Sequence, residues 1–206
     1  MPDLHSGLSD ARVYLRNQLW RIDLQLLKSY SLGRAGRMAI GNRPQDSHTP
    51  IDFTYGETHW GSMRRILQLT EARAGSRLME LGSGTGRLAL FASKCIGLHA
   101  HGVEMITPFV TRANEIANDM SLDRCHFEQG NIFDHSWAEA SILYIVATTF
   151  GEETLRELGK KCLELSPGAR IVVTSHSPAC PNLALETMEV LDFSWGPTAV
   201  FVLRRN

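Results

Sequence analysis

The sequence has no excess of charge of either sign. Its 206 residues carry 21 basic and 22 acidic side chains, which gives a formal net charge of -1 with neutral histidines. Proteins that bind nucleic acid tightly usually carry a basic excess, because each phosphate contact takes a Lys or an Arg. We therefore expect no nucleic-acid partner. Hydrophobic residues make up 43% and charged residues 21%, as in an ordinary globular protein with a buried core.

Cysteine is scarce, and its spacing is not that of a metal site. The four cysteines form no C-x-x-C pair and do not stand at zinc-ligand spacing with a histidine. We expect reduced, mostly buried thiols and no bound metal. The cysteines are Cys95, Cys125, Cys162 and Cys180.

Long apolar runs are also missing. The longest strongly apolar stretch, residues 140–150, is too short to cross a bilayer, because a spanning helix takes about 20 apolar residues. Residues 1–10 are polar and lack the apolar region of a signal peptide. From these two features we expect a cytoplasmic protein without a membrane span. The sequence leaves the oligomeric state open.

The first quarter of the chain differs in pattern from the rest. Apolar residues at helical spacing predict a helix over residues 10–30. Residues 31–56 are rich in Gly, Pro, Arg and polar residues and predict a long connection, which is unusual unless the segment has a function. A second helix is expected over residues 57–71. We take residues 1–50 as an N-terminal extension that covers the site or packs on the core, and residues 51–206 as one domain.

From residue 77 onward, short apolar stretches alternate with amphipathic ones. This alternation predicts a parallel sheet with helices on both faces. Residues 141–147 are the most apolar stretch and are expected at the centre of the sheet, and residues 186–203 predict a final strand pair that turns at residues 195–197. The expected fold class is α/β: a doubly wound, mostly parallel seven-stranded sheet with an antiparallel terminal strand and an N-terminal helical extension. The remaining strands are expected at residues 77–81, 99–104, 124–129 and 170–175.

A glycine-rich turn follows the first predicted strand. Residues 80–86 read Glu-Leu-Gly-Ser-Gly-Thr-Gly and lead into a predicted helix. Glycines allow a sharp turn and the close approach of a ligand, and the free amides at a helix start can receive an anionic or polar ligand group. A dinucleotide site of the form G-x-G-x-x-G would need its third glycine at position 87, where this chain has Arg87.

The G-x-G-x-G turn, with Glu80 two residues ahead of it, is similar to that of the class I methyltransferases. That resemblance implies S-adenosylmethionine as the cofactor. Glu104 ends the second predicted strand, where a carboxylate can accept hydrogen bonds from both ribose hydroxyls of either a dinucleotide or a sulfonium nucleoside. Asn131 follows the third strand, where class I methyltransferases hold the adenine.

Three further segments narrow the resemblance. They are Tyr-Gly-Glu-Thr at residues 55–58, Thr-Thr-Phe-Gly-Glu-Glu at 148–153 and Ser-Trp-Gly at 194–196. Together with residues 80–84 and 102–104 they resemble the non-SET histone-lysine methyltransferases of the disruptor-of-telomeric-silencing family. Similarity extends over roughly residues 51–204, and the core also resembles the mitochondrial lysine methyltransferases of the ATP-synthase c-subunit type.

This resemblance implies roles for individual residues. The first segment would pack over the methionine end of the cofactor, and residues 147–150 would line a lysine channel. Tyr55, Phe150 and Trp195 would form the channel walls and are the candidate catalytic residues; no dedicated base is implied. The implied cofactor-binding residues are Tyr55, Glu57, Thr58, Glu80, Gly82, Ser83, Gly84, Thr85, Gly86, Glu104, Met105, Asn131, Ile132, Ala147 and Thr148.

The sequence also departs from that family. Thr148 and Thr149 stand where the family has asparagines, and the basic nucleosome-binding extension is missing. The first hypothesis is N-methylation of a protein lysine. The alternatives are a small-molecule methyltransferase, a non-catalytic module that binds S-adenosylmethionine, and a nicotinamide-dependent reductase. The histidines are scattered along the sequence, and His59 and His176 are the candidates for acid–base chemistry.

Overall fold

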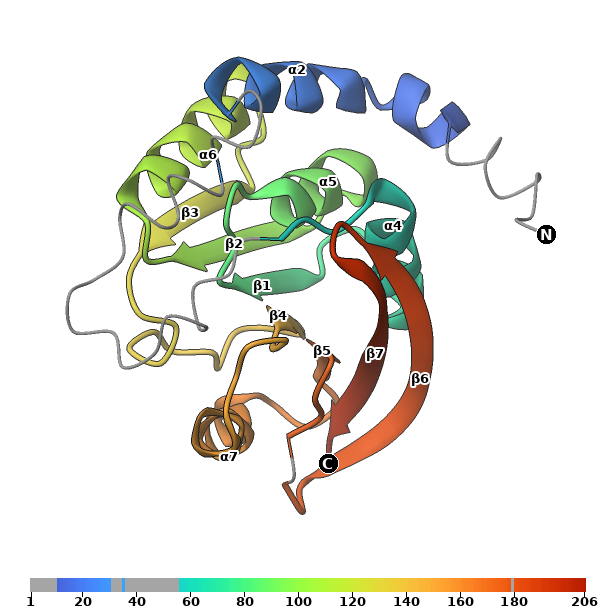
Figure 1. Cartoon of the computed structure of the whole chain (residues 1–206), viewed down its shortest axis with the longest axis vertical. Helices are drawn as coiled ribbons and strands as arrows, with labels where there is room; N and C mark the ends of the chain where they lie inside the picture. The colour runs from blue at the N-terminus through green and yellow to red at the C-terminus, as the bar shows by residue number, and fades with distance from the viewer. Residues whose placement is uncertain (1–10, 31–34, 36–55, 179) are drawn as a thin grey trace.

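The computed structural model describes residues 11–30, 35, 56–178 and 180–206. Within these ranges the chain forms one sheet of seven strands (Figure 1). The strands are β1 (Arg77–Leu81), β2 (His99–Glu104), β3 (Cys125–Gln129), β4 (Ile142–Val146), β5 (Arg170–Thr174), β6 (Leu183–Phe193) and β7 (Gly196–Arg205). Tyr55, like most of the predicted connection over residues 31–56, lies outside the described residues.

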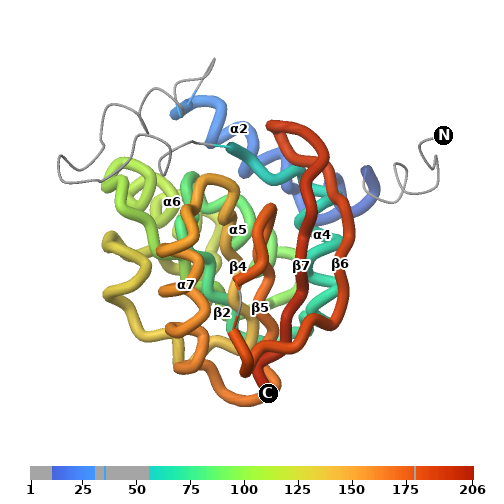
Figure 2. Tube along the Cα trace, turned by 60° about the horizontal axis from the view of Figure 1, so that its bottom comes forward, coloured from blue at the N-terminus to red at the C-terminus, as the bar shows by residue number. Residues whose placement is uncertain are grey.

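The strand order across the sheet is β3-β2-β1-β4-β5-β7-β6. Strands β1 to β5 pair in parallel, whereas β7 pairs antiparallel with both β5 and β6. Figure 2 shows β7 between β5 and β6. The predicted fold class is confirmed, and β4, the most apolar strand, lies at the centre of the sheet as expected.

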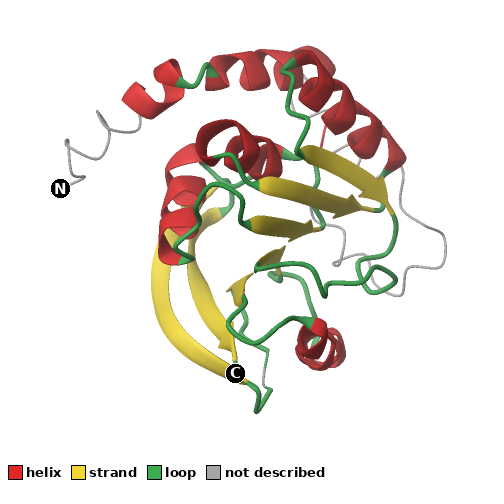
Figure 3. Ribbon diagram, turned by 180° about the vertical axis from the view of Figure 1, so that it is seen from behind, coloured by secondary structure: helices red, strands yellow, loops and turns green. Residues whose placement is uncertain are grey.

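Helices cover the sheet unevenly. Four of them share one hydrophobic cluster with one face of the sheet, and a single helix with the short 3-10 turn that follows it packs on the other face (Figures 1 and 3). The first group is α2 (Leu19–Tyr30), α4 (Trp60–Leu69), α5 (Arg87–Ile96) and α6 (Thr107–Asp119). The second is α7 (Glu152–Lys161) with the 3-10 turn Cys162–Glu164. No helix among the described residues is long and apolar enough to cross a membrane.

Two helix boundaries differ from the sequence prediction. The helix predicted over residues 10–30 is interrupted by a turn at residues 17–18, where Gln18 takes a φ of 56°, and α2 begins after it. The helix predicted over residues 57–71 starts only at Trp60, because Thr58 pairs with Phe193 as an isolated β-bridge. The tertiary pairing competes successfully with the local helical preference there.

Helix α2 packs on the core through apolar contacts and one ion-pair network. Leu19, Ile22 and Leu26 are buried against the sheet helices. Beside them, Arg87 at the start of α5 donates to Asp23 of α2 over 2.8 Å, and its side chain is only 15% exposed. The N-terminal helix is therefore held next to the end of the glycine-rich turn.

The last glycine of the turn allows α5 to pack closely. Gly86 has a φ of 78°, and a Cβ on it would lie 2.6 Å from the Phe127 ring and 3.0 Å from Ala113. Such distances are well below van der Waals contact, so only glycine fits between β3 and α6 at this point. Gly75 has a similar φ of 85° but open space around its missing Cβ.

These two glycines make a matched pair. We predict that Gly86→Ala lowers the free energy of unfolding by about 3 kcal/mol, because it adds both backbone strain and overpacking. Gly75→Ala should cost about 1 kcal/mol, because only the backbone strain applies. Urea unfolding of both variants measures the difference. Equal losses in the two variants would contradict the packing role of Gly86.

The docking of α2 can be tested in the same way. We predict that Arg87→Ala destabilises the chain by about 2 kcal/mol, since it leaves partly buried carboxylates without their charged partner. The amides of α2 should also exchange with solvent faster. Arg77→Ala, which removes an exposed pair with Glu139, is the control and should cost less than about 1 kcal/mol. Unchanged hydrogen exchange in α2 of Arg87→Ala would rule out the docking role.

Candidate functional site

The candidate residues gather at one edge of the sheet. Because β1 to β5 run in parallel, the segments that follow them lie at their shared carboxyl edge. Strand β6 runs in the same direction, so the turn at residues 194–195 lies there too. In open α/β sheets this edge is where ligands bind. The fold thus brings together segments that stand far apart in the sequence.

The glycine-rich turn is held against the end of β2. The amides of Gly82 and Ser83 both donate to the Val103 carbonyl, over 2.9 and 3.0 Å. Gly82 and Gly84 have φ values of 69° and 53°, in the left-handed region that favours glycine. Among the described residues, apart from Gly82 itself and its two chain neighbours, no atom lies within 4 Å of the position that a Cβ of Gly82 would take. With respect to the described residues, the turn is therefore open at Gly82, which is exposed, whereas Ser83, Thr85 and Gly86 are buried.

The Glu104 carboxylate lies over this turn. One of its oxygens accepts the Gly84 amide over 2.7 Å, and the other accepts the Ile106 amide over 3.0 Å. Burial raises the pKa of Glu104, and the amides of Ile106, Gly84 and Met105 act in the opposite direction. Each carboxylate oxygen can accept a further hydrogen bond, so Glu104 fits the expected pair of ribose hydroxyls.

Glu80 lies beneath the same turn and has a different environment. It is 6% exposed, and its carboxyl accepts the amide of Ala89 over 3.0 Å in the first turn of α5. Since the residue before α5 is Gly86, which has no side chain to cap the helix, Glu80 supplies the cap. Burial raises the pKa of Glu80 to about 8. Glu80 therefore fixes the start of α5 relative to β1, and so supports the glycine-rich turn that connects them.

A polar loop follows β3. Asn131 is exposed, and its side-chain oxygen accepts the Phe133 amide over 3.1 Å. The Ile132 carbonyl accepts the indole N–H of the buried Trp137 over 3.0 Å, which fixes the course of the loop. The loop begins where the Gly130 amide donates to the Glu104 carbonyl over 3.0 Å. The candidate adenine loop and the candidate ribose acid are thereby joined.

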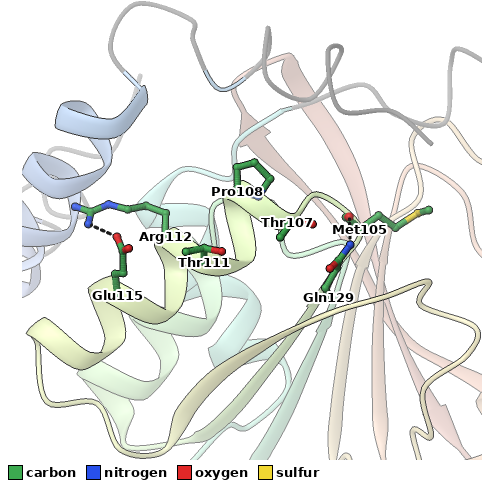
Figure 4. Close-up of a pocket in the computed structure, with 7 residues that line it drawn as sticks. All are labelled: Met105, Thr107, Pro108, Thr111, Arg112, Glu115 and Gln129. Atoms are coloured by element: carbon green, nitrogen blue, oxygen red, sulfur yellow. Dashed lines mark hydrogen bonds and ion pairs between the residues drawn. The ribbon is translucent and has the colours of Figure 1, made fainter. Parts of the chain in front are cut away.

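A cavity of about 720 Å³ opens beside this loop (Figure 4). One end is at Met105, whose carbonyl accepts the side-chain amide of Gln129 over 3.4 Å, and the other end is at Arg112, which pairs with Glu115. The lining residues are Met105, Thr107, Pro108, Thr111, Arg112, Glu115 and Gln129. Of the predicted cofactor residues, Met105 lines this cavity, which therefore adjoins the ribose end of the candidate site.

Residues 56–58 lie against the β6–β7 turn. The Glu57 amide donates to the Ser194 hydroxyl over 2.8 Å, and the Ser194 amide donates to the Glu57 carbonyl over 2.9 Å. A Cβ on Gly56 would lie 2.3 Å from the Trp195 indole, so the ring lies directly on the glycine backbone. The two sequence segments that the family resemblance singled out separately are in direct contact.

Side chains attach residues 57–58 to the rest of the fold. The Thr58 hydroxyl lies 3.0 Å from the buried Tyr144 hydroxyl of β4. The Glu57 carboxylate accepts a hydrogen bond from Arg87 over 2.8 Å. Sequence reasoning noted Arg87 only as a missing glycine, and it did not single out Tyr144 or Asp23. No sequence signal pointed to them, because their partners stand far away along the chain.

The ends of β4 and β5 form another part of the edge. Ala147 is fully buried, whereas Thr148 is exposed and its hydroxyl lies 2.8 Å from that of Ser175. Ser175 has a φ of 68°, which is uncommon for a residue with a side chain and marks local strain. His176 follows it and is exposed, as is His59 at the start of α4.

The predicted channel walls have separate neighbours. Trp195 stacks on Phe193 with ring centroids 4.7 Å apart, whereas Phe150 packs against the cluster beneath α7. Tyr55, the third predicted wall, lies outside the described residues. Trp195 thus lies with Gly56 and Phe193 at the β6–β7 turn. Phe150 lies with Ala147 after the end of β4.

Comparison of the sequence with known proteins finds a similar methyltransferase. The sequence is 26% identical to phosphoethanolamine N-methyltransferase of Plasmodium falciparum (isolate 3D7) over 141 residues, which are 61% of this chain and 50% of that protein. The chain thus matches about half the length of this relative.

Similar solved structures share the fold. One is an RNA methyltransferase from Salinibacter ruber in complex with S-adenosyl-L-homocysteine, at a TM-score of 0.62 and 23% identity, covering 72% of this chain and 92% of that one. Another is TrmN from Thermus thermophilus, at a TM-score of 0.62 and 20% identity. The match covers 71% of this chain and 48% of the TrmN chain.

The sequence profile of the methyltransferase domain matches residues 72–192. These residues make up more than half of the chain, and they include the glycine-rich turn, Glu104 and Asn131. The chain therefore belongs to the methyltransferase domain family.

Proposed function

We propose that the chain transfers a methyl group from S-adenosylmethionine to an amine nitrogen, with a protein lysine as the acceptor. Family membership makes the chain a methyltransferase with S-adenosylmethionine as the expected cofactor. The choice of a lysine is supported by the contact between Gly56-Glu57 and Ser194-Trp195, since both segments resemble those of a lysine-methylating family. The proposed domain arrangement is an extension over residues 1–50 and a catalytic domain over residues 51–206.

The proposed cofactor contacts follow the carboxyl edge from β1 to β4. Glu104 would accept the ribose hydroxyls, and the loop at Asn131 would hold the adenine. The open side of the turn at Gly82 and Gly84 would receive the amino-acid part. Residues 55–58 would cover the methionine end, and the Ser194 turn holds Glu57 of this segment.

Bound S-adenosylmethionine supplies an activated methyl group on a sulfonium. The chain must align the acceptor nitrogen with that group and exclude water. A lysine reacts only after it loses its proton, and an apolar surrounding favours the neutral amine. The Trp195 and Phe150 rings would supply this surrounding, and the Thr148 and Ser175 hydroxyls can accept hydrogen bonds from the amine.

A small phosphorylated amine is the second candidate acceptor. It is favoured by the similarity to phosphoethanolamine N-methyltransferase, a relative whose name specifies a small amine. A protein lysine and a small phosphorylated amine would both be methylated on an amine nitrogen. The two candidates differ in the residues that would bind the remainder of the acceptor. A non-catalytic module that binds S-adenosylmethionine is the third hypothesis.

The role of Glu104 is testable by calorimetry. We predict that Glu104→Ala raises the Kd for S-adenosylmethionine about 10- to 100-fold, the equivalent of one hydrogen bond to a charged group of about 1.5–3 kcal/mol. The Kd of Glu104→Gln should lie between those of the parent chain and Glu104→Ala, because the glutamine amide oxygen can still accept a hydrogen bond. Glu139→Ala, an exposed carboxylate paired with Arg77, is the control and should bind normally. A folded Glu104→Ala protein with unchanged affinity for S-adenosylmethionine would refute the ribose contact. Tight binding of NAD by the parent chain, in place of S-adenosylmethionine, would refute the proposed identity of the cofactor.

The acceptor can be identified by transfer of label. We predict that the chain moves tritium from methyl-labelled S-adenosylmethionine into protein of a cell lysate, and that acid hydrolysis releases the label as methyl-lysine. Glu104→Ala should transfer much less. Label in small molecules would select the second candidate, and label lost on ribonuclease treatment would point to RNA. No transfer by a protein that binds the cofactor would contradict catalysis.

A further inference from the structure

A cluster of three histidines and one glutamate lies at the β2–β3 edge of the sheet, apart from the candidate methyl-transfer contacts. His101 of β2 and His126 of β3 are register partners, and Glu128 stands two residues further along β3. His135 comes from the loop after β3. Because side chains alternate along a strand, His126 and Glu128 point away from the face where Phe127 is buried with α5 and α6. All four side chains are on the face that carries α7.

Two of the three histidines meet at one carboxylate oxygen of Glu128. Glu128 Oε2 lies 3.2 Å from His101 Nε2 and 3.3 Å from His135 Nδ1. The His126 ring stacks on the His101 ring with centroids 4.2 Å apart. One nitrogen of each of these two histidines and a carboxylate oxygen of Glu128 all lie within 4.8 Å of one another. Three donor groups therefore lie close enough to share one ion, and the His135 Nδ1 atom lies beside the same Glu128 oxygen.

Two of the spacings in the cluster are close to the separation of ligand atoms around a zinc ion. Zinc binds imidazole nitrogen and carboxylate oxygen at about 2.0–2.2 Å in a tetrahedral arrangement, which separates two ligand atoms by about 3.4 Å. The two distances to Glu128 Oε2 are within about 0.2 Å of that separation. Three imidazoles and one carboxylate form a donor set typical of zinc, whereas magnesium and calcium prefer oxygen ligands alone.

Two further observations indicate a built site. Within the described part of the chain, His101 Nε2 is buried and makes no hydrogen bond of good geometry, although Glu128 Oε2 lies 3.2 Å away. An unsatisfied buried nitrogen calls for an explanation, and a metal bond would satisfy it. The second observation is Gly130, where a Cβ would lie 2.2 Å from His135 Nε2. Only a glycine there leaves room for the His135 ring to reach Glu128.

We propose that His101, His126, Glu128 and His135 bind one zinc ion. The ion would join β2 and β3 to His135 of the candidate adenine loop, and it would not use the side chains of Asn131 and Ile132, which are the candidate cofactor contacts in that loop. The spacing of the histidines in the sequence gave no reason to expect a metal, because the strand pairing alone brings residues 101 and 126 together. The proposal stands independently of which acceptor the chain methylates.

Metal binding by the purified full chain tests the proposal. Chelator-treated protein is titrated with zinc in competition with a coloured chelator, and with cobalt, whose tetrahedral complexes absorb visible light. We expect one equivalent of zinc per chain and a tetrahedral cobalt spectrum. His135→Gln should weaken zinc binding by about 100-fold or more, since even changes outside the ligand set cost about 10- to 100-fold. His99→Gln, an exposed histidine of β2 outside the cluster, is the matched control and should bind like the parent chain.

Thermal unfolding supplies a second readout. Zinc that binds only the folded chain should raise its Tm, and the rise should disappear in His135→Gln and persist in His99→Gln. Circular dichroism without zinc establishes that His135→Gln is folded, and Glu128→Gln provides a second variant with the same expected loss. Failure of the folded parent chain to bind zinc would overturn the proposal and leave an ionic cluster of histidines and one carboxylate. Equal zinc binding by the parent chain, His135→Gln and Glu128→Gln would overturn it as well.

Discussion

The phenyl ring of Phe127 sets how closely the glycine-rich turn approaches the neighbouring strands. A Cβ on Gly86 would lie 2.6 Å from this ring, and a Cβ on Gly102 would lie 2.4 Å from it. The ring thus occupies the space that two glycines leave, one at the start of α5 and one in β2. This close packing brings the Gly84 amide within 2.7 Å of the Glu104 carboxylate. The positions of Glu104, the candidate ribose acid, and of the glycine-rich turn both depend on this packing.

Charged groups extend this arrangement to the N-terminal helix. Glu80 caps α5 from inside the sheet, and Arg87, the first residue of that helix, reaches outward to Asp23 and Glu57. The Arg87 guanidinium also lies 4.4 Å from the centre of the Trp60 ring. A position that would be glycine in a dinucleotide site therefore connects α2, the segment at residues 57–58 and α4. Residues 11–30 are thus a structural support of the candidate site as well as a layer of the core.

Local patterns in the sequence were sufficient to predict most of the fold. Apolar stretches such as residues 141–147 predict buried strands, because a parallel sheet buries both faces. The glycine turn was found because backbone geometry there requires glycine. The break at Gln18 and the extended segment at Thr58 were not predicted, since each depends on contacts with distant residues. The same reason explains why the ion pair of Asp23 with Arg87 left no sequence signal.

The loop after β3 is where the candidate methyl-transfer site and the proposed zinc site meet. Its first residue, Gly130, donates its amide to the Glu104 carbonyl and lies against the His135 ring. Asn131, the next residue, turns the chain by accepting the Phe133 amide. A side chain at position 130 would displace His135, and a displaced His135 would no longer reach Glu128. Gly130 thus leaves room for the His135 ring and also donates its amide to the backbone of Glu104, the candidate ribose acid. The loop is held from two sides, by β2 at its start and by the His135–Glu128 contact four residues after Asn131. These two contacts restrict where the Asn131 side chain lies at the carboxyl edge of the sheet.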